Sequence, residues 1–144
     1  MKRKAENEVK LTLPSRSSNE SYARVAVAAF AAQLDPTLEE INDLKTAVSE
    51  AVTNCIVHAY PDRIGPVTIT VGLYAGNRVR VQVRDKGVGI ADVKQAMEPL
   101  FTTGGGERAG LGFAVMQTFT DRLRVRSAPG KGTAVIMEKE IRKR

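Results

Sequence analysis

Two runs of the chain, Val67-Thr-Ile-Thr-Val-Gly-Leu-Tyr74 and Arg78-Val-Arg-Val-Gln-Val-Arg84, alternate apolar and polar positions. The segment between them, Ala75-Gly-Asn77, is typical of a hairpin turn. Because successive side chains of a strand point to opposite faces, the alternation predicts a sheet with one buried face and one polar face. We therefore expect an α+β fold rather than a doubly wound one: a two-layer α/β sandwich with helices on one face of a mixed, mostly antiparallel sheet.

Shorter strands are expected on both sides of this hairpin. The alternating segment Val9–Leu13 predicts a first strand, and Leu123–Val125 predicts a strand late in the chain. The turn Pro129-Gly-Lys-Gly132 should then lead into a last strand over Thr133–Glu138.

The first two helices are each predicted from a capping box, in which the side chain at the N-cap and the one three residues later bond to each other's backbone amides. Ser17-Ser-Asn-Glu20 predicts a helix running to about Leu34, and Thr37-Leu-Glu-Glu40 predicts one running to about Ala59. The residues expected to face the core are Tyr22, Val25, Ala26, Ala29 and Phe30 in the first helix, and Ile41, Leu44, Val48, Val52, Cys55, Ile56 and Ala59 in the second.

Two further helices are expected in the second half of the chain. A short one should cover Asp92–Met97, and a longer one should run from about Leu111 to about Asp121. Between them, Gly104-Gly-Gly106 next to Glu107 and Arg108 predicts a mobile loop.

The composition is that of one domain covering residues 1–144, with short basic tails at both ends. The net charge of +6 admits nucleic-acid binding, but neither tail combines its basic residues with aromatic ones for base stacking. We interpret the tails as solvated, expect no direct nucleic-acid partner, and note that the charge suits an acidic protein partner.

The single cysteine, Cys55, excludes an intramolecular disulfide and is expected to be buried and inert, since its neighbours are apolar and helical. No apolar run approaches the roughly 20 residues of a membrane span, and no secretory segment opens the chain. We therefore expect a cytoplasmic protein without a membrane partner.

Glu50 and Asn54 lie one turn apart on the second predicted helix. A solvated helix face explains most such pairs, but here the helix around them is apolar and several glycine-rich turns follow. The carboxamide oxygen of Asn54 suits Mg²⁺, which keeps several waters and takes phosphate oxygens as other ligands. Glu50 could then accept a proton from an attacking hydroxyl or water.

Asp85 ends a strand and enters the turn Lys86-Gly-Val-Gly89. An ordinary turn is one interpretation. The functional one is that its carboxylate accepts a hydrogen bond from an exocyclic amine such as that of adenine, while Gly87 and Gly89 let the backbone approach the ring.

Gly110-Leu-Gly112 is expected to open a helix, whose free amides would bind an anion. The glycines at 104–106 could close over a triphosphate, and Arg108 is the nearest cation that could neutralise it. A flexible surface loop with a solvated charge is the alternative.

Other chemistries find no support in the sequence. It contains no Gly-x-x-x-x-Gly-Lys-Ser/Thr run of a P-loop, and neither the His-Arg-Asp nor the Asp-Phe-Gly motif of protein kinases. The one histidine, His58, is interpreted as a structural or pocket-rim residue, so no histidine-based metal site or catalytic triad is expected.

The segments Glu50–Asn54, Asp85–Gly89, Gly110–Gly112 and Gly132-Thr133 resemble the N, G1 and G2 boxes and the late Gly-Thr of the GHKL ATPase superfamily, which includes gyrase and the histidine kinases. Within it, further stretches resemble the family of sporulation anti-sigma F factors, which are also serine kinases. These stretches are Asn19-Glu-Ser-Tyr-Ala-Arg24, Gln33-Leu-Asp-Pro36, Val48–Asn54, Pro99-Leu-Phe-Thr-Thr103 and Gly110-Leu-Gly-Phe113.

This resemblance implies a Bergerat-type sandwich that acts as a homodimer, binds ATP with Mg²⁺, inhibits sigma F and phosphorylates a serine of an anti-anti-sigma factor. It implies that Glu50 is the catalytic base, Asn54 the magnesium ligand and Asp85 the adenine acceptor. Arg24 would contact both protein partners. The remaining residues implied to bind nucleotide are Gly87, Gly89, Thr103, Gly104, Arg108, Gly110, Gly112 and Thr133.

The chain departs from the family pattern after Phe101-Thr-Thr103, where Gly104-Gly-Gly106 replaces the usual lysine and proline and the loop is about one residue shorter. This departure bears on phosphate contacts and on the rate of phosphoryl transfer. Two alternatives therefore remain open: a nucleotide-gated binding module without kinase activity, and an anti-sigma kinase of the general stress response. Cys55 also stands where the family usually has alanine.

Overall fold

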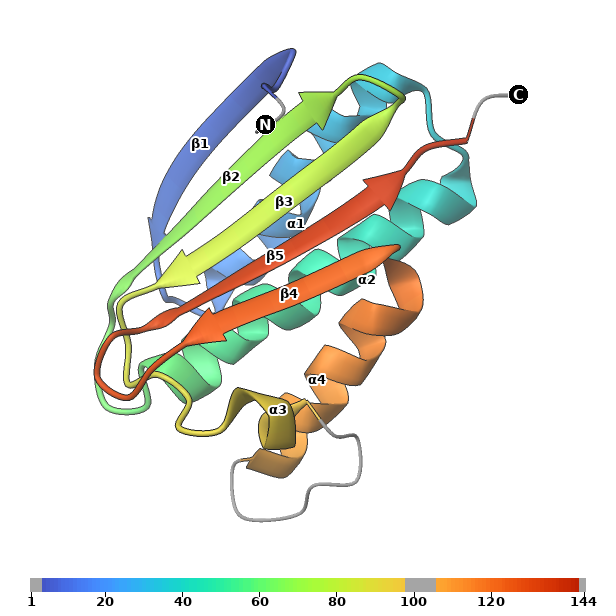
Figure 1. The fold of residues 1–144 in the computed structure, drawn as a ribbon. Helices are drawn as coiled ribbons and strands as arrows, with labels where there is room; N and C mark the ends of the chain where they lie inside the picture. The colour runs from blue at the N-terminus through green and yellow to red at the C-terminus, as the bar shows by residue number, and fades with distance from the viewer. Residues whose placement is uncertain (1–3, 98–105, 143–144) are drawn as a thin grey trace.

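The computed structural model describes residues 4–97 and 106–142, which fold into one sheet with helices packed on one of its faces (Figure 1). The strand order is β1-β2-β3-β5-β4, and every neighbouring pair is antiparallel. The strands are β1 (Asn7–Pro14), β2 (Pro66–Tyr74), β3 (Arg78–Asp85), β4 (Arg122–Ser127) and β5 (Thr133–Glu140). The predicted two-layer α+β class is thus confirmed, and the sheet is fully antiparallel over the described residues.

In the view of Figure 1, the first helices pass behind the strands and the later ones lie beside β4. They are α1 (Ser18–Ala31), α2 (Leu38–Asn54), α3 (Val93–Ala96) and α4 (Gly106–Phe119). A 3₁₀ turn, η1 (Ala32–Leu34), extends α1, and a π-helical turn, η2 (Cys55–Ala59), extends α2. The end predicted for the second helix, near Ala59, is therefore the end of this π-helical turn.

The β2–β3 hairpin forms the centre of the sheet, as its alternation predicts. Val67 pairs with Asp85 at one end and Tyr74 with Arg78 at the other, so the loop at 75–77 joins the strands in register. The inward valines of β3, at 79, 81 and 83, are fully buried. Each buried aliphatic side chain of this kind contributes about 1.5–3 kcal/mol of transfer free energy, so this hairpin supplies much of the core.

The buried face of α1 differs from the prediction. Ala23, Val27 and Ala31 are buried, whereas Tyr22 and Val25 remain 59% and 53% exposed. The segment carries alanine and other apolar residues around most of its circumference, so several helical stripes fit its periodicity equally well. The stripe that packs against α2 and the sheet is the one with the smaller side chains, because these let α1 approach both closely.

The two predicted capping boxes have different outcomes. At the start of α2, Thr37 Oγ1 accepts a hydrogen bond from the Glu40 amide at 3.0 Å, and the Thr37 amide donates to Glu40 Oε1 at 2.8 Å. At the start of α1, Ser17 makes no side-chain cap bond, so this prediction was wrong. Ser17 already has helical dihedrals, and the Glu20 carboxylate is engaged by Ser49 and by Arg24 instead.

Helix α2 is the central helix of the layer, packed against both α1 and α4. Its buried residues Leu44, Val48 and Val52 confirm the predicted stripe, to which the structure adds Ala47 and Ala51. Within the described residues, no helix is both long enough and apolar enough to cross a membrane.

The two caps give a matched pair of tests. We expect Thr37→Ala to lower the free energy of unfolding by about 1 kcal/mol, because it leaves helix-terminal amides without an acceptor. Ser17→Ala should change it much less, since the Ser17 side chain makes no cap bond. Urea denaturation of both variants measures this, and equal losses would contradict the assignment of the caps.

Candidate functional site

The carboxylate of Asp85 joins three segments that are distant in sequence. Its Oδ1 accepts hydrogen bonds from the amides of Gly87 at 2.9 Å and Thr133 at 3.1 Å. Its Oδ2 lies 3.5 Å from the Cys55 sulfur. The end of β3, the start of β5 and the turn after α2 therefore meet at one carboxyl group, which is only 6% exposed.

Burial raises the pKa values of both Asp85 and Cys55. Loss of solvation raises the pKa of Asp85, and hydrogen bonds from Gly87, Cys55 and Thr133 partly oppose the rise. Burial also raises the pKa of the Cys55 thiol, and the neighbouring Asp85 carboxylate raises it further. The expected burial of Cys55 is confirmed, and its thiol remains a protonated donor to Asp85 rather than a reactive thiolate.

The turn after Asp85 is held against its neighbours by backbone contacts. Val88 donates to the carbonyl of Ala59 at 3.0 Å, and Gly130 donates to the carbonyl of Val88 at 2.7 Å. Gly89 has φ of 78°, and a Cβ there would collide with the backbone of Ala128. This position therefore requires glycine both for its dihedral and for its close approach.

A cavity of about 310 Å³ lies beside this carboxylate, between the end of α2, the turn 89–92, α3 and α4. Four of the predicted site residues line it: Asn54, Asp85, Gly89 and Thr133. Its walls are mostly apolar, with Ile90, Ala96, Phe113 and Val135 among them, and His58 is part of the lining. Mostly apolar walls with a few polar groups are typical of small-ligand sites.

Glu50 and Asn54 meet α4 at Gly112. A Cβ at this glycine would lie 3.1 Å from Glu50 Oε2 and 3.2 Å from Asn54 Oδ1, so the ends of both side chains lie close against α4 at this position. Asn54 borders the cavity, whereas Glu50 lies one turn earlier on α2 and is not part of its lining. The Asn54 Nδ2 atom is buried and has no hydrogen-bond partner in the described part of the protein.

Helix α4 begins at Gly106, about five residues before the predicted start near Leu111. Gly110 and Gly112 therefore lie inside the helix, and their amides are not the free donors of a helix terminus. A glycine within a helix costs only about 1 kcal/mol relative to alanine, and the close packing of Gly112 on α2 offsets this cost. The prediction that these glycines open the helix was wrong.

Four further predicted site residues are Thr103, Gly104, Arg108 and Arg24. Thr103 and Gly104, with the predicted mobile loop up to residue 105, lie outside the described residues. Arg108 belongs to the first turns of α4. Arg24 lies on α1, where its guanidinium donates to Ser21 at 3.1 Å and its Nε is 3.8 Å from the Glu20 carboxylate.

Two side chains that organise this site were missed by the sequence analysis. The Tyr60 hydroxyl accepts from the Lys86 amide at 2.5 Å and donates to the Pro66 carbonyl at 2.7 Å, so it holds the residue that follows Asp85. Ser127 Oγ accepts from the Ile90 amide at 2.8 Å and bonds Thr133 Oγ1 at 2.8 Å.

These residues fit a nucleotide with its magnesium ion. A buried acceptor in an apolar cavity suits a flat base with an exocyclic amine, and the carboxamide of Asn54 borders the same space. A carboxamide oxygen is a suitable single protein ligand for Mg²⁺, which takes its remaining ligands from waters and phosphates.

Comparison with known sequences places this geometry in a family context. The family described as "Histidine kinase-like ATPase domain" matches residues 13–139. A protein named "Anti-sigma F factor" from Thermoanaerobacter pseudethanolicus is 60% identical over 136 residues, which cover 94% of each chain. One of the same name from Clostridium novyi is 54% identical over 138 residues, covering 94% of this chain and 96% of the other.

Solved structures share the fold at low sequence identity. The RsbU and RsbW domains of a Mycobacterium tuberculosis protein match with a TM-score of 0.71 at 18% identity, covering 96% of this chain and 33% of the other. The mycobacterial sensor histidine kinase MprB matches with a TM-score of 0.56 at 16% identity, covering 94% of this chain and 100% of the other.

The raised pKa of Asp85 predicts a pH dependence of stability. Because the folded-state pKa lies above the unfolded one, the folded protein holds this proton more tightly. Stability therefore falls as the pH rises through the interval just above the ordinary range of an aspartic acid. Over that interval, the free energy of unfolding of the wild type should fall relative to that of Asp85→Asn.

Urea denaturation at a series of pH values measures this difference. The same substitution at the exposed Asp62 is the control for loss of one negative charge. A wild type that gains stability over Asp85→Asn as the pH rises through this interval would show that the sign is wrong.

Proposed function

We propose that this chain, which belongs to the histidine kinase-like ATPase family and within it to the anti-sigma F factors, is an ATP-dependent serine kinase. Membership of this family implies use of a nucleotide and a sigma factor as partner. The finer proposal is that it binds and inhibits sporulation sigma F and phosphorylates a serine of an anti-anti-sigma factor. The observation that carries it is the convergence of Asp85, Thr133 and Asn54 on one apolar cavity.

Asp85 is proposed to recognise the base of ATP. Its Oδ1 is occupied by two backbone amides, whereas the described contact of Oδ2 is the weak thiol donor of Cys55. The carboxylate can therefore accept a further hydrogen bond from the exocyclic amine of adenine. The apolar walls contributed by Ile90, Ala96 and Val135 favour burial of the flat ring.

Asn54 is proposed to hold the magnesium ion through Oδ1, next to the phosphates. When bound, this ion neutralises charge on the phosphoryl groups during transfer. The Asn54 carboxamide lies against Gly112 of α4, where a larger residue would crowd its oxygen. The proposed binding of phosphate by Gly110 and Gly112 requires α4 to shorten from its start, because both glycines lie inside it here.

Glu50 is proposed to act as the general base. One helical turn from Asn54, its carboxylate could accept the proton of the substrate serine as that hydroxyl attacks the terminal phosphorus. Glu50 Oε2 also lies close to Gly112, so the proposed base and the proposed metal ligand are found at one contact between α2 and α4.

We propose that the chain acts as a homodimer. Helix α1, through Arg24, is proposed to contact the sigma factor and the anti-anti-sigma factor. Arg24 lies between Tyr22 and Val25 in the sequence of this helix, and both of these apolar side chains are more than half exposed. Exposed apolar groups next to an arginine are typical of protein interfaces. Since these partners are transcription regulators, the proposed place of action is the cytoplasm.

Replacing the base tests the kinase proposal. We expect Glu50→Gln to lower phosphoryl transfer from labelled ATP to the anti-anti-sigma factor by roughly 10²–10⁴-fold, the usual contribution of a general base. ATP binding, measured by calorimetry, should change little because Glu50 does not line the cavity.

Glu39→Gln removes the same charge from the exposed first turn of the same helix and should transfer phosphate normally. Normal transfer by Glu50→Gln would refute its role as base. Absence of transfer by the wild type, with ATP binding intact, would instead support the alternative of a nucleotide-gated module without kinase activity.

Sigma factor binding provides a separate test. Purified sigma F should co-elute with the full chain in the presence of Mg²⁺ and ATP and much less without nucleotide. Arg24→Ala should reduce co-elution while ATP binding persists, because Arg24 lies away from the cavity. Arg16→Ala, at an exposed arginine just before α1, is the control. Equal co-elution with and without ATP would contradict nucleotide-dependent inhibition.

A further inference from the structure

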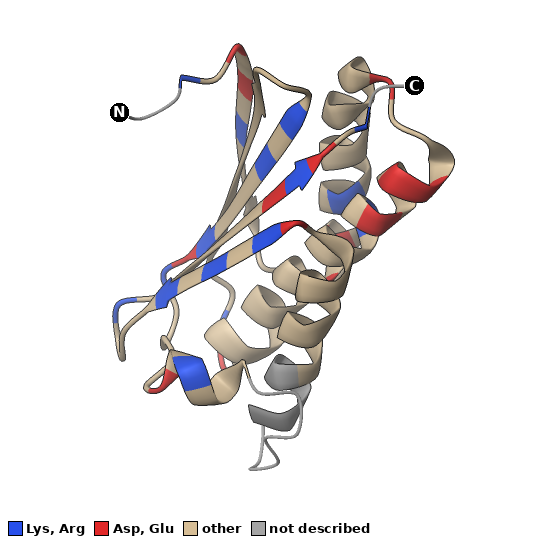
Figure 2. Ribbon diagram, turned by 45° about the vertical axis from the view of Figure 1, so that its right-hand side comes forward, with Lys and Arg blue, Asp and Glu red and all other residues tan. Residues whose placement is uncertain are grey.

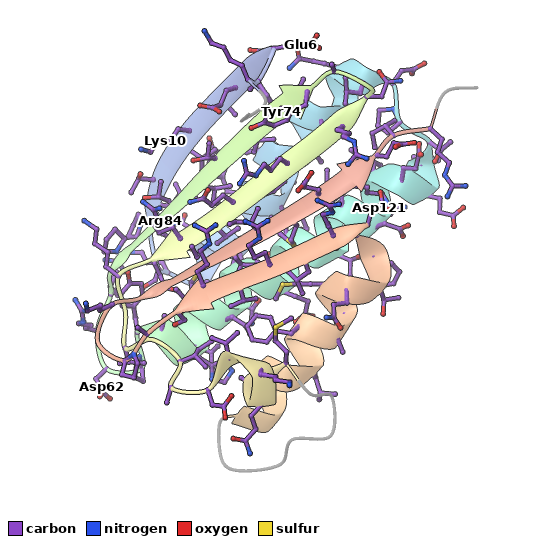
Figure 3. All side chains as sticks on the ribbon, in the orientation of Figure 1. Glu6, Lys10, Asp62, Tyr74, Arg84 and Asp121 are labelled. Atoms are coloured by element: carbon purple, nitrogen blue, oxygen red, sulfur yellow. The ribbon has the colours of Figure 1, made fainter. Side chains whose placement is uncertain are left out.

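The face of the sheet that the helices leave open carries a concentration of arginine. The positions are Arg78, Arg80 and Arg84 on β3 and Arg122, Arg124 and Arg126 on β4. Together they border a trough of about 700 Å³ that runs over β5, and we call this surface the arginine trough. Basic residues appear as blue bands along the strands in Figure 2. Figure 3 views this face, with Tyr74 and Arg84 toward opposite ends of the β2–β3 hairpin.

The strand register aligns these arginines in rows across β5. Arg84 and Arg126 both pair with Ala134, and Arg124 pairs with Ile136. The floor between the two arginine columns is therefore small and apolar at this end. Ile136 is only 6% exposed although it belongs to the open face, which is consistent with cover by the aliphatic stems of its arginine neighbours.

The charge of the trough is largely uncompensated. Among the described residues, only Arg78 of the six forms ion pairs, at 3.7 Å to Glu138 and 3.7 Å to Glu140. Glu138 lines the trough toward its hairpin end, and Glu140 pairs with Arg78 at the same end of the sheet without being part of the lining. The other end, formed by Arg84, Arg124 and Arg126, has no acidic residue in its lining. Concentrating like charges in this way is unfavourable in the free protein, so a partner that neutralises them gains binding energy.

We propose that the arginine trough binds an extended acidic segment of a protein partner. Alternate residues of a strand are about 6.8 Å apart, so each arginine column matches the spacing of carboxylates at every second residue of an extended chain. Guanidinium groups bind carboxylates through two parallel hydrogen bonds, and carboxylates at every second residue of an extended chain all lie on the face that would be turned toward the arginines.

The composition of the lining favours a protein segment over single-stranded nucleic acid. The trough lining contains one aromatic residue, Tyr74, so it offers no series of rings on which bases could stack. Because the trough lies on the side of the sheet opposite the helices and the nucleotide cavity, binding there should not depend on ATP.

Binding of a defined probe to the full-length chain tests the proposal. The probe is a fluorescein-labelled ten-residue peptide of alternating Glu and Thr, followed by anisotropy at moderate salt. We expect saturable binding that is equal with and without ATP. The triple variant Arg84→Gln, Arg124→Gln, Arg126→Gln should weaken it roughly tenfold or more, through loss of three charge-assisted contacts.

A matched variant removes three positive charges elsewhere, with Arg16→Gln, Lys94→Gln and Arg142→Gln at exposed positions. It should bind the peptide as the wild type does, and circular dichroism should show both triple variants folded, since every substituted side chain is on the surface. Equal loss in the two variants would reduce the effect to net charge and overturn the proposal. Failure of the peptide to bind would also overturn it, as would preferential binding of a single-stranded or duplex DNA of similar charge.

Discussion

The buried Asp85 carboxylate is the constraint on which the rest of the site depends. It accepts hydrogen bonds from the amide of Gly87 after β3, from the amide of Thr133 at the start of β5, and from the thiol of Cys55, which directly follows α2. Burying a charged group is unfavourable unless hydrogen bonds compensate, so these three segments are held at fixed distances from one another. A cavity with a polar group at one side and apolar walls elsewhere follows directly from this arrangement.

Helix α2 both packs in the core and carries the polar residues of the candidate site. Its side chains Leu44 and Val48 are buried in the core, while Glu50 and Asn54 near its C-terminal end face α4. Polar groups on a central helix are tolerated because Gly112 leaves room for them at the helix–helix contact. The proposed nucleotide site is thereby built on the helix that packs against both α1 and α4, which favours a precise geometry.

The two faces of the sheet differ in composition. The inner face supplies the valines that pack beneath the helices, and the outer face of β3 and β4 carries arginines at the alternate positions. The same period of two thus produces both a core and a charged surface. The proposed nucleotide site and the proposed protein-binding surface thus lie on opposite sides of one sheet.

The sequence by itself determined what depends on local pattern: the alternating hairpin, the Thr37 capping box and the set of turns that become Asp85 and its neighbours. The buried face of α1 and the start of α4 were decided only by tertiary structure, because alanine-rich and glycine-containing segments satisfy several helical stripes and boundaries equally well. The roles of Tyr60 and Ser127 also required the fold, since each joins segments far apart in the chain. The arginine trough depended on strand order as well, because β5 enters between β3 and β4 and only its register brings their side chains into rows.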